Sequence, residues 1–146
     1  MGFFGELRQG RRDDAELGKG LWRRAHDRFH RGLDRYHQVL EGMEDEQSYT
    51  ELVAIANDLA ELSARVRAVC MAAQRLAPSD GLDIPGQLAD VHRALSKAGN
   101  SLATTAEAAA MLRLAATAAP AGAASVRRRA EAVQEHVDEA ERLLHR

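Results

Sequence analysis

The chain has 146 residues, of which 45% are hydrophobic, 29% are charged and 4% are aromatic. This composition fits one globular domain and excludes a disordered chain, and abundant alanine with few β-branched runs argues against a β-sandwich or barrel. The net charge of −2 excludes a general attraction to nucleic acid, which would need a local basic face to bind.

Two further features indicate a cytoplasmic location. Cys70 is the single cysteine, so no intrachain disulfide is expected, as is typical of a reducing compartment. The sequence shows no secretory signal. Its most apolar tract, residues 102–124, contains Glu107, Arg113 and Pro120, so we expect no membrane span.

Residues 1–20 are predicted to form an amphipathic or flexible segment outside the main domain. Its five glycines weaken a continuous helix. Apolar residues followed by arginines indicate peripheral contact with the inner face of a membrane, or with another anion. The residues expected to make this contact are Phe3, Phe4, Arg8, Arg11 and Arg12. The alternative is a terminus that covers one end of the main domain.

The next stretch carries most of the aromatic bulk of the chain. Trp22, Phe29, Tyr36 and Met43 recur every seven residues, which places them on one face of a helix. Later segments are dominated by Ala, Leu and Val. We therefore expect this face to be buried, with its large side chains packed between smaller ones.

Residues 21–146 are predicted to form one domain of four helices. Hydrophobic residues are spaced alternately three and four apart in the later segments, and strong turn signals separate the segments. Short connections favour antiparallel neighbours. The fold expected is all-α, an up-down-up-down antiparallel four-helix bundle with coiled-coil-like heptad seams.

Two helix starts are predicted from local signals. Ser48 and Glu51 have the spacing of a capping box, which predicts that the second helix of this domain begins near Ser48. Asp83 or a neighbour is expected to cap the third helix, with Pro85 in its first turn, where the missing N–H costs least.

Histidines give one candidate metal or haem site. His26 and His30 are one turn apart on the first helix. Antiparallel connections are expected to bring other imidazoles and the single thiol to about the same position along the axis of the bundle, where such groups can bind a metal or haem iron. The candidate ligands are His26, His30, His92, His136 and Cys70. The alternative is a set of half-buried residues at the edge of the core, and we predict no bound cofactor.

Arginines form a second stripe on the same helix. With the arginines before residue 20 it could bind the phosphates of lipid or nucleic acid. The stripe consists of Arg24, Arg28, Arg31 and Arg35. The alternative is a solvated face on which Glu16, Asp27 and Asp34 pair with some of these arginines. Residues 41–61 are acidic and contain neither Lys nor Arg. If the basic and acidic faces lie apart, they could meet in a homotypic or partner contact, and if they are adjacent, they neutralise each other.

No catalytic motif is present, so we expect a protein that is not an enzyme. The sequence lacks the Gly-x-Ser-x-Gly, Ser-x-x-Lys, Walker and dinucleotide-binding patterns. The leading hypothesis is an interaction or scaffold protein that binds itself or a protein partner. Binding of a metal or haem through the histidines, and of an anion or nucleic acid through the arginine stripe, are the alternatives.

Overall fold

The fold is known from a computed structural model, which describes residues 3–115 and 120–146, apart from the side chains at 3, 120 and 121. These residues form five α-helices and one 3₁₀ turn and contain no strand, which confirms the all-α class. The elements are α1 (Phe3–Leu17), α2 (Leu21–Glu41), α3 (Glu46–Leu76), η1 (Gly86–Leu88), α4 (Ala89–Leu114) and α5 (Pro120–Leu144). Within the described residues, no helix is long and apolar enough to cross a bilayer.

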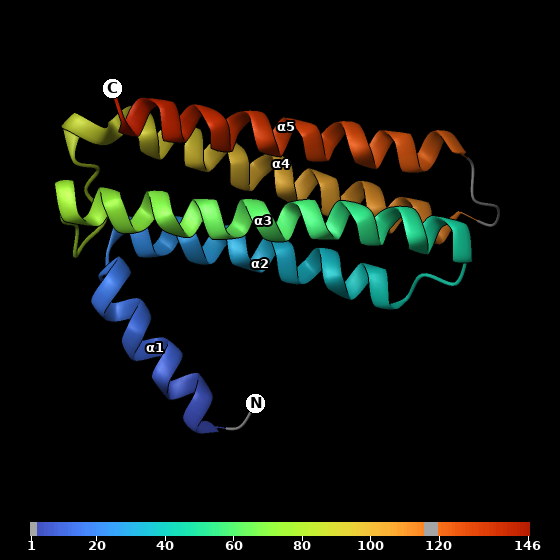
Figure 1. The fold of residues 1–146 in the computed structure, drawn as a ribbon, viewed down its shortest axis with the longest axis horizontal. Coiled ribbons are helices and arrows are strands. Elements are labelled where there is room, and N and C mark those ends of the chain that lie inside the picture. The colour runs from blue at the N-terminus through green and yellow to red at the C-terminus, as the bar shows by residue number, and fades with distance from the viewer. Residues whose placement is uncertain (1–2, 116–119) are drawn as a thin grey trace.

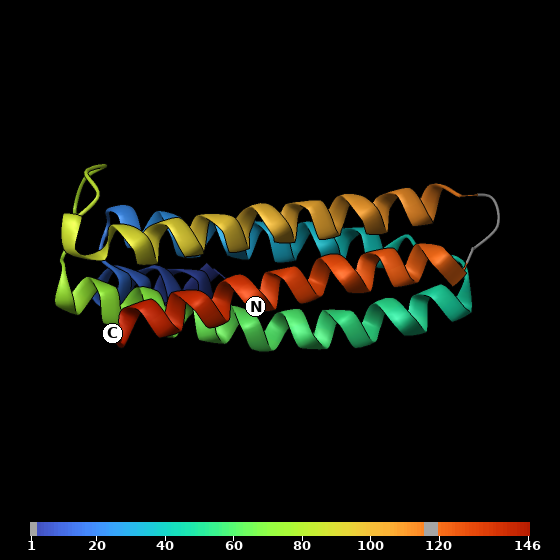
Figure 2. The same ribbon diagram turned by 90° about the horizontal axis from the view of Figure 1, so that it is seen from above.

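The four longer helices lie side by side along the long axis of the molecule (Figures 1 and 2). α2 packs against α3 and α4, and α5 packs against the same two helices. The α2–α3 connection lies at one end of the molecule and the α3–α4 connection at the other (Figure 1). α1 leaves this body at an angle and is a fifth helix, formed by the residues that were predicted to be an amphipathic or flexible segment.

The aromatic stripe of α2 fills the centre of this body. Trp22 and Tyr36 are 0% exposed and Phe29 is 2% exposed, which confirms their predicted burial. Met43 lies beyond the end of α2 and is only partly buried. Both polar rings also donate to backbone carbonyls at opposite ends of α3, Trp22 Nε1 to Ala77 O at 2.9 Å and Tyr36 Oη to Leu52 O at 2.8 Å.

The predicted caps of two helices are wrong, and the second of these helices also begins later than expected. α3 begins at Glu46 and is capped by Asp45, whose carboxylate accepts a hydrogen bond from Ser48 N at 2.8 Å. An ionised side chain is a strong acceptor and favours the positive end of the helix dipole, so Asp45 replaces Ser48 as cap. α4 begins at Ala89 without a side-chain cap, because Pro85 precedes η1 instead of occupying the first turn.

The turn between α1 and α2 is fixed against the segment that follows α3. Gly18 has φ of +73°, a left-handed conformation that glycine adopts without steric cost. Leu21 N donates to Ser79 Oγ at 3.0 Å. A Cβ at Gly20 would lie 2.4 Å from the backbone of Ser79, so only glycine fits there. The direction in which α1 leaves the body therefore has a local structural cause.

Candidate interaction surfaces

The predicted histidine layer is only partly assembled. His26 is buried, and its ring stacks on that of His30 with centroids 6.1 Å apart. His26 Nδ1 lies 2.9 Å from Asp27 Oδ1, and its Nε2 lies 3.4 Å from Arg67 Nη1. His30 is exposed and lies 3.7 Å from an oxygen of Asp34. Both nitrogens of His26 therefore already face protein groups.

The other three candidate ligands lie in different surroundings. His92 packs edge-on against Trp22, with centroids 6.1 Å apart, and burial followed by the charge of Arg28 lowers its pKa. Cys70 is fully buried, which raises the pKa of its thiol to about 12. His136 lies half-buried on α5. In the described part of the chain, no three His, Cys, Asp or Glu residues form a group that could hold a metal ion.

An ionic cluster between α1 and the helical body escaped the sequence analysis. Arg67 of α3 contacts Asp13 and Glu16 of α1, each at 2.8 Å. Arg23 of α2 contacts Asp14 at 2.8 Å and Asp27 at 3.2 Å. Residues 1–20 had no predicted fold, so no pattern in the sequence could link them to α3.

Burial and hydrogen bonding act in opposite directions on Asp13 in this cluster. Burial by itself raises the pKa of Asp13. Hydrogen bonds from Gln9 and Arg67, together with the positive charges of Arg67 and Arg23, outweigh it and lower the pKa below its usual value. The carboxylate is therefore held ionised, and α1 is attached through its acidic side.

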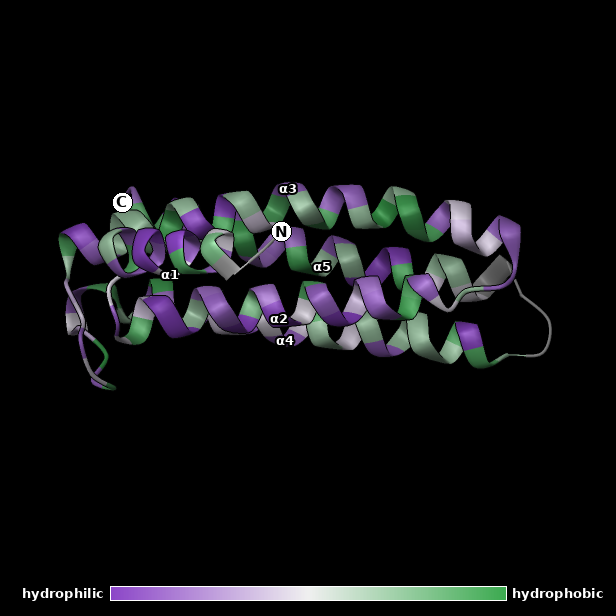
Figure 3. Ribbon diagram, turned by 90° about the horizontal axis from the view of Figure 1, so that it is seen from below, coloured by the Kyte–Doolittle hydropathy of each residue, from purple (hydrophilic) through white to green (hydrophobic). Residues whose placement is uncertain are grey.

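The arginine stripe of α2 is not neutralised by the predicted acids. Arg24, Arg28, Arg31 and Arg35 are all exposed, and the outward side of α2 is largely hydrophilic (Figure 3). Asp27 pairs with Arg23, Asp34 lies beside His30, and Glu16 pairs with Arg67. Within the stripe, Arg28 donates to the side-chain oxygen of Asn100, and none of the four has an ion pair within the described residues. The stripe is thus an exposed row of arginines without an ion pair in the described part of the chain.

The outward side of α1 combines apolar and basic residues. Phe4 is 75% exposed and Leu7 is 43% exposed. Arg8, Arg11 and Arg12 are also exposed. The side chain of Phe3, the remaining residue of the predicted contact, lies outside the described ones. These residues are on the side of α1 that does not face Arg67.

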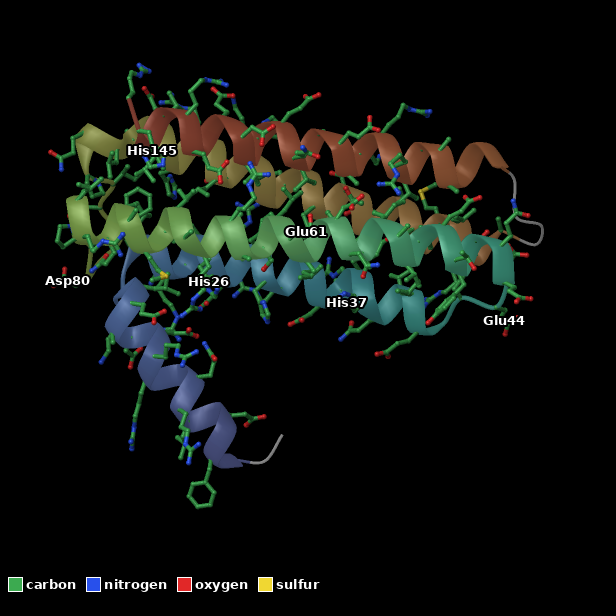
Figure 4. All side chains as sticks on the ribbon, in the orientation of Figure 1. His26, His37, Glu44, Glu61, Asp80 and His145 are labelled. Carbon is green, nitrogen blue, oxygen red and sulfur yellow. The ribbon has the colours of Figure 1, made fainter. Side chains whose placement is uncertain are left out.

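The acidic residues around the α2–α3 connection form a third exposed group, which we call the acidic turn. Its members are Glu41, Glu44, Asp45, Glu46 and Glu51. Glu44 and Asp80 lie at opposite ends of the molecule, and His26 lies toward the Asp80 end (Figure 4). The acidic turn is therefore separated along the axis from the start of the arginine stripe.

Charged residues elsewhere on the body tie neighbouring helices together. Arg65 of α3 contacts Asp138 at 2.5 Å and also Glu141, both on α5. Arg127 of α5 contacts Asp58 of α3 at 2.6 Å. These arginines are used within the chain, in contrast to the stripe on α2.

The comparisons with known proteins supply no relative. No protein-family model, no curated protein and no solved structure matches the chain.

Proposed function

We propose that the protein is a non-enzymatic helical-bundle interaction protein that binds a second copy of itself through opposite charges. In this proposal α2–α5 constitute an up-down-up-down antiparallel four-helix bundle with coiled-coil-like heptad seams. Support comes from the buried hydrophobic residues that recur along all four helices and from the pairing of each helix with two neighbours. The bundle would serve as a rigid body that holds two charged surfaces apart.

One observation carries the proposal: the arginine stripe and the acidic turn are both exposed, and the acidic turn follows the stripe at the C-terminal end of α2. At 1.5 Å per helical residue, Glu41 of the acidic turn lies about 26 Å along α2 from Arg24 and about 9 Å from Arg35. Two molecules placed side by side in opposite directions would bring each stripe near the acidic turn of the other. Such a pair is two-fold symmetric and closes on itself, as most homodimers do.

Charge complementarity of this kind predicts association that weakens with salt, because exposed charges are screened beyond about 10 Å at 0.1 M ionic strength. Sedimentation equilibrium over a series of protein concentrations, at low and high salt, would measure it. We expect a monomer–dimer equilibrium that shifts toward monomer as salt is added. A monomer at every concentration in low salt would contradict the proposal.

Charge reversal provides the sharper test. Arg31→Glu with Arg35→Glu, or Glu44→Arg with Glu46→Arg, should each abolish the homodimer. A mixture of the two variants should restore a pair, because one complementary contact in each direction is recovered. The matched control is a reversal of two arginines that are exposed outside the stripe, Arg75→Glu with Arg142→Glu, which should leave the equilibrium unchanged. Failure of the mixture to associate would count against the assigned surfaces.

The exposed arginine stripe also favours one alternative, binding of a polyanion such as nucleic acid. Four phosphate contacts on duplex DNA predict that log K falls with log salt at a slope of about −3.6. A gel-shift series against random-sequence duplex would measure the slope. Two results together would favour nucleic-acid binding over self-association. The parent protein would shift the duplex in the gel, the Arg31→Glu, Arg35→Glu variant would not, and the parent would form no dimer in sedimentation.

A further inference from the structure

α1 carries two chemically different sides. Residues at positions i, i+3, i+7 and i+10 of a helix share a face. One such set consists of Glu6, Gln9, Asp13 and Glu16, of which Asp13 and Glu16 contact Arg67 of the body. The opposite set follows the spacing i, i+3, i+4, i+7 and consists of Phe4, Leu7, Arg8 and Arg11. We call this second set, with Arg12 beside it, the outer face of α1.

The attachment of α1 orients this outer face away from the body. Leu17 is fully buried, Asp13 and Glu16 contact Arg67, and the turn after the helix is fixed at Gly18 and Gly20. All of these contacts lie in the last turns of α1. Its first turns lie farthest from α2–α5 (Figure 1), so the apolar residues Phe4 and Leu7 are presented at the tip.

We propose that the outer face of α1 binds the surface of an anionic lipid bilayer. Phe4 and Leu7 would enter the boundary between headgroups and acyl chains, and Arg8, Arg11 and Arg12 would contact the headgroup phosphates. Binding of amphipathic segments to bilayers combines buried apolar area with attraction to anionic lipid. The proposal does not depend on self-association, which uses other residues.

The arrangement fits a bilayer better than nucleic acid. The exposed aromatic and aliphatic side chains sit at the tip, and the arginines follow within two helical turns, so the order from tip to body is apolar and then basic. A bilayer has the same order, from acyl chains to phosphates. Three of the four carboxylates of α1, Asp13, Asp14 and Glu16, pair with Arg23 and Arg67 instead of facing the headgroups, and Glu6 is exposed outside the set of apolar and basic residues.

Vesicle co-sedimentation of the full chain tests the proposal. We expect binding to vesicles of equal parts phosphatidylcholine and phosphatidylglycerol, and little binding to phosphatidylcholine alone. Each basic residue near an anionic surface strengthens binding about fivefold, so Arg8→Gln with Arg11→Gln should weaken it roughly 25-fold. Phe4→Ser with Leu7→Ser should weaken it about tenfold or more by removing the apolar insertion.

Matched controls separate the outer face from exposed residues in general. Met111 and Leu114 are 73% and 80% exposed at the end of α4, so Met111→Ser with Leu114→Ser removes similar apolar area elsewhere. This variant should bind vesicles as the parent does. Phe4→Trp adds a reporter whose emission should shift to the blue only with anionic vesicles, while the buried Trp22 provides a constant background.

Each outcome decides the matter. Equal binding of the Phe4→Ser, Leu7→Ser variant and the parent, or no binding of the parent to anionic vesicles, would overturn the proposal. Binding of a random-sequence RNA through Arg8 and Arg11 without vesicle binding would assign the face to nucleic acid instead. The Phe4→Ser, Leu7→Ser variant should still dimerise in sedimentation, so loss of lipid binding and loss of self-association are distinguishable.

Discussion

The two buried polar rings of α2 provide a matched test of how the helical body is held together. Trp22→Phe and Tyr36→Phe each remove one hydrogen bond to a backbone carbonyl of α3 or its end. The acceptors differ. Leu52 O lies inside α3, where a helical carbonyl also accepts from the amide four residues on. Ala77 is the C-cap residue, beyond the last turn of α3, so its carbonyl depends on the indole.

This difference sets the expected magnitudes. Tyr36→Phe removes one of two bonds to its acceptor and should lower the free energy of unfolding by about 1 kcal/mol. Trp22→Phe leaves a buried carbonyl without a partner, which costs about 1–3 kcal/mol, and also leaves space where the larger ring was. We therefore expect about 2–4 kcal/mol in total for Trp22→Phe, and a larger loss than for Tyr36→Phe.

Urea unfolding followed by far-UV circular dichroism would measure both losses. The control is Tyr49→Phe, which removes the same hydroxyl from a side chain that is 45% exposed and should change stability by less than about 0.5 kcal/mol. Equal effects of Tyr36→Phe and Tyr49→Phe, or a smaller loss for Trp22→Phe than for Tyr36→Phe, would refute the reasoning about buried acceptors.

Three further predictions concern the attachment of α1 and the single thiol. Asp13 has a lowered pKa in the folded protein, so its contribution to stability is present above the usual pKa of 3.8 and is lost as the pH falls through the lower folded value. The protection of the α1 amides relative to their intrinsic exchange rates should therefore fall below about pH 4, before the rest of the protein unfolds. Gly20→Ala places a Cβ against the backbone that follows α3 and should lower the free energy of unfolding by about 2 kcal/mol. Gly10→Ala has open space around its Cβ and should instead stabilise α1 slightly. Denaturant titrations would measure both changes. Cys70 is fully buried with a pKa raised to about 12, so alkylation by iodoacetamide at pH 8 should need unfolding and follow the unfolding rate in mass spectrometry.

The sequence predicted what depends on periodicity and missed what depends on contacts between distant residues. Trp22, Phe29 and Tyr36 are buried as expected, because a repeat of seven places side chains on one helical face wherever the neighbours lie. The cap of α3 was misassigned, because Asp45 and Ser48 are both good caps and only the structure shows which one accepts.

The histidine hypothesis shows a different limit. Antiparallel connections predict the level of a residue along the bundle but not the side from which it approaches. His92 reaches α2 from α4 and packs on Trp22, whereas His26 faces Arg67 of α3. Imidazoles at the same position along the helix axis therefore need not lie close together. α1 escaped prediction for a related reason, since its partner Arg67 lies about 50 residues away and no local pattern links the two.

The distribution of ion pairs explains why the predicted pairing of the arginine stripe is absent and why the stripe stays exposed. Arg23 and Arg67 have side chains only 22% exposed, so each loses hydration in the fold and gains from nearby carboxylates in return. Arg24, Arg31 and Arg35 remain hydrated and gain little from an exposed pair, which is worth about 0–1 kcal/mol. Asp27 and Glu16 therefore pair with the less exposed Arg23 and Arg67. The exposed arginines of the stripe keep their charge, and in the proposed self-association the surface of the second molecule would desolvate them.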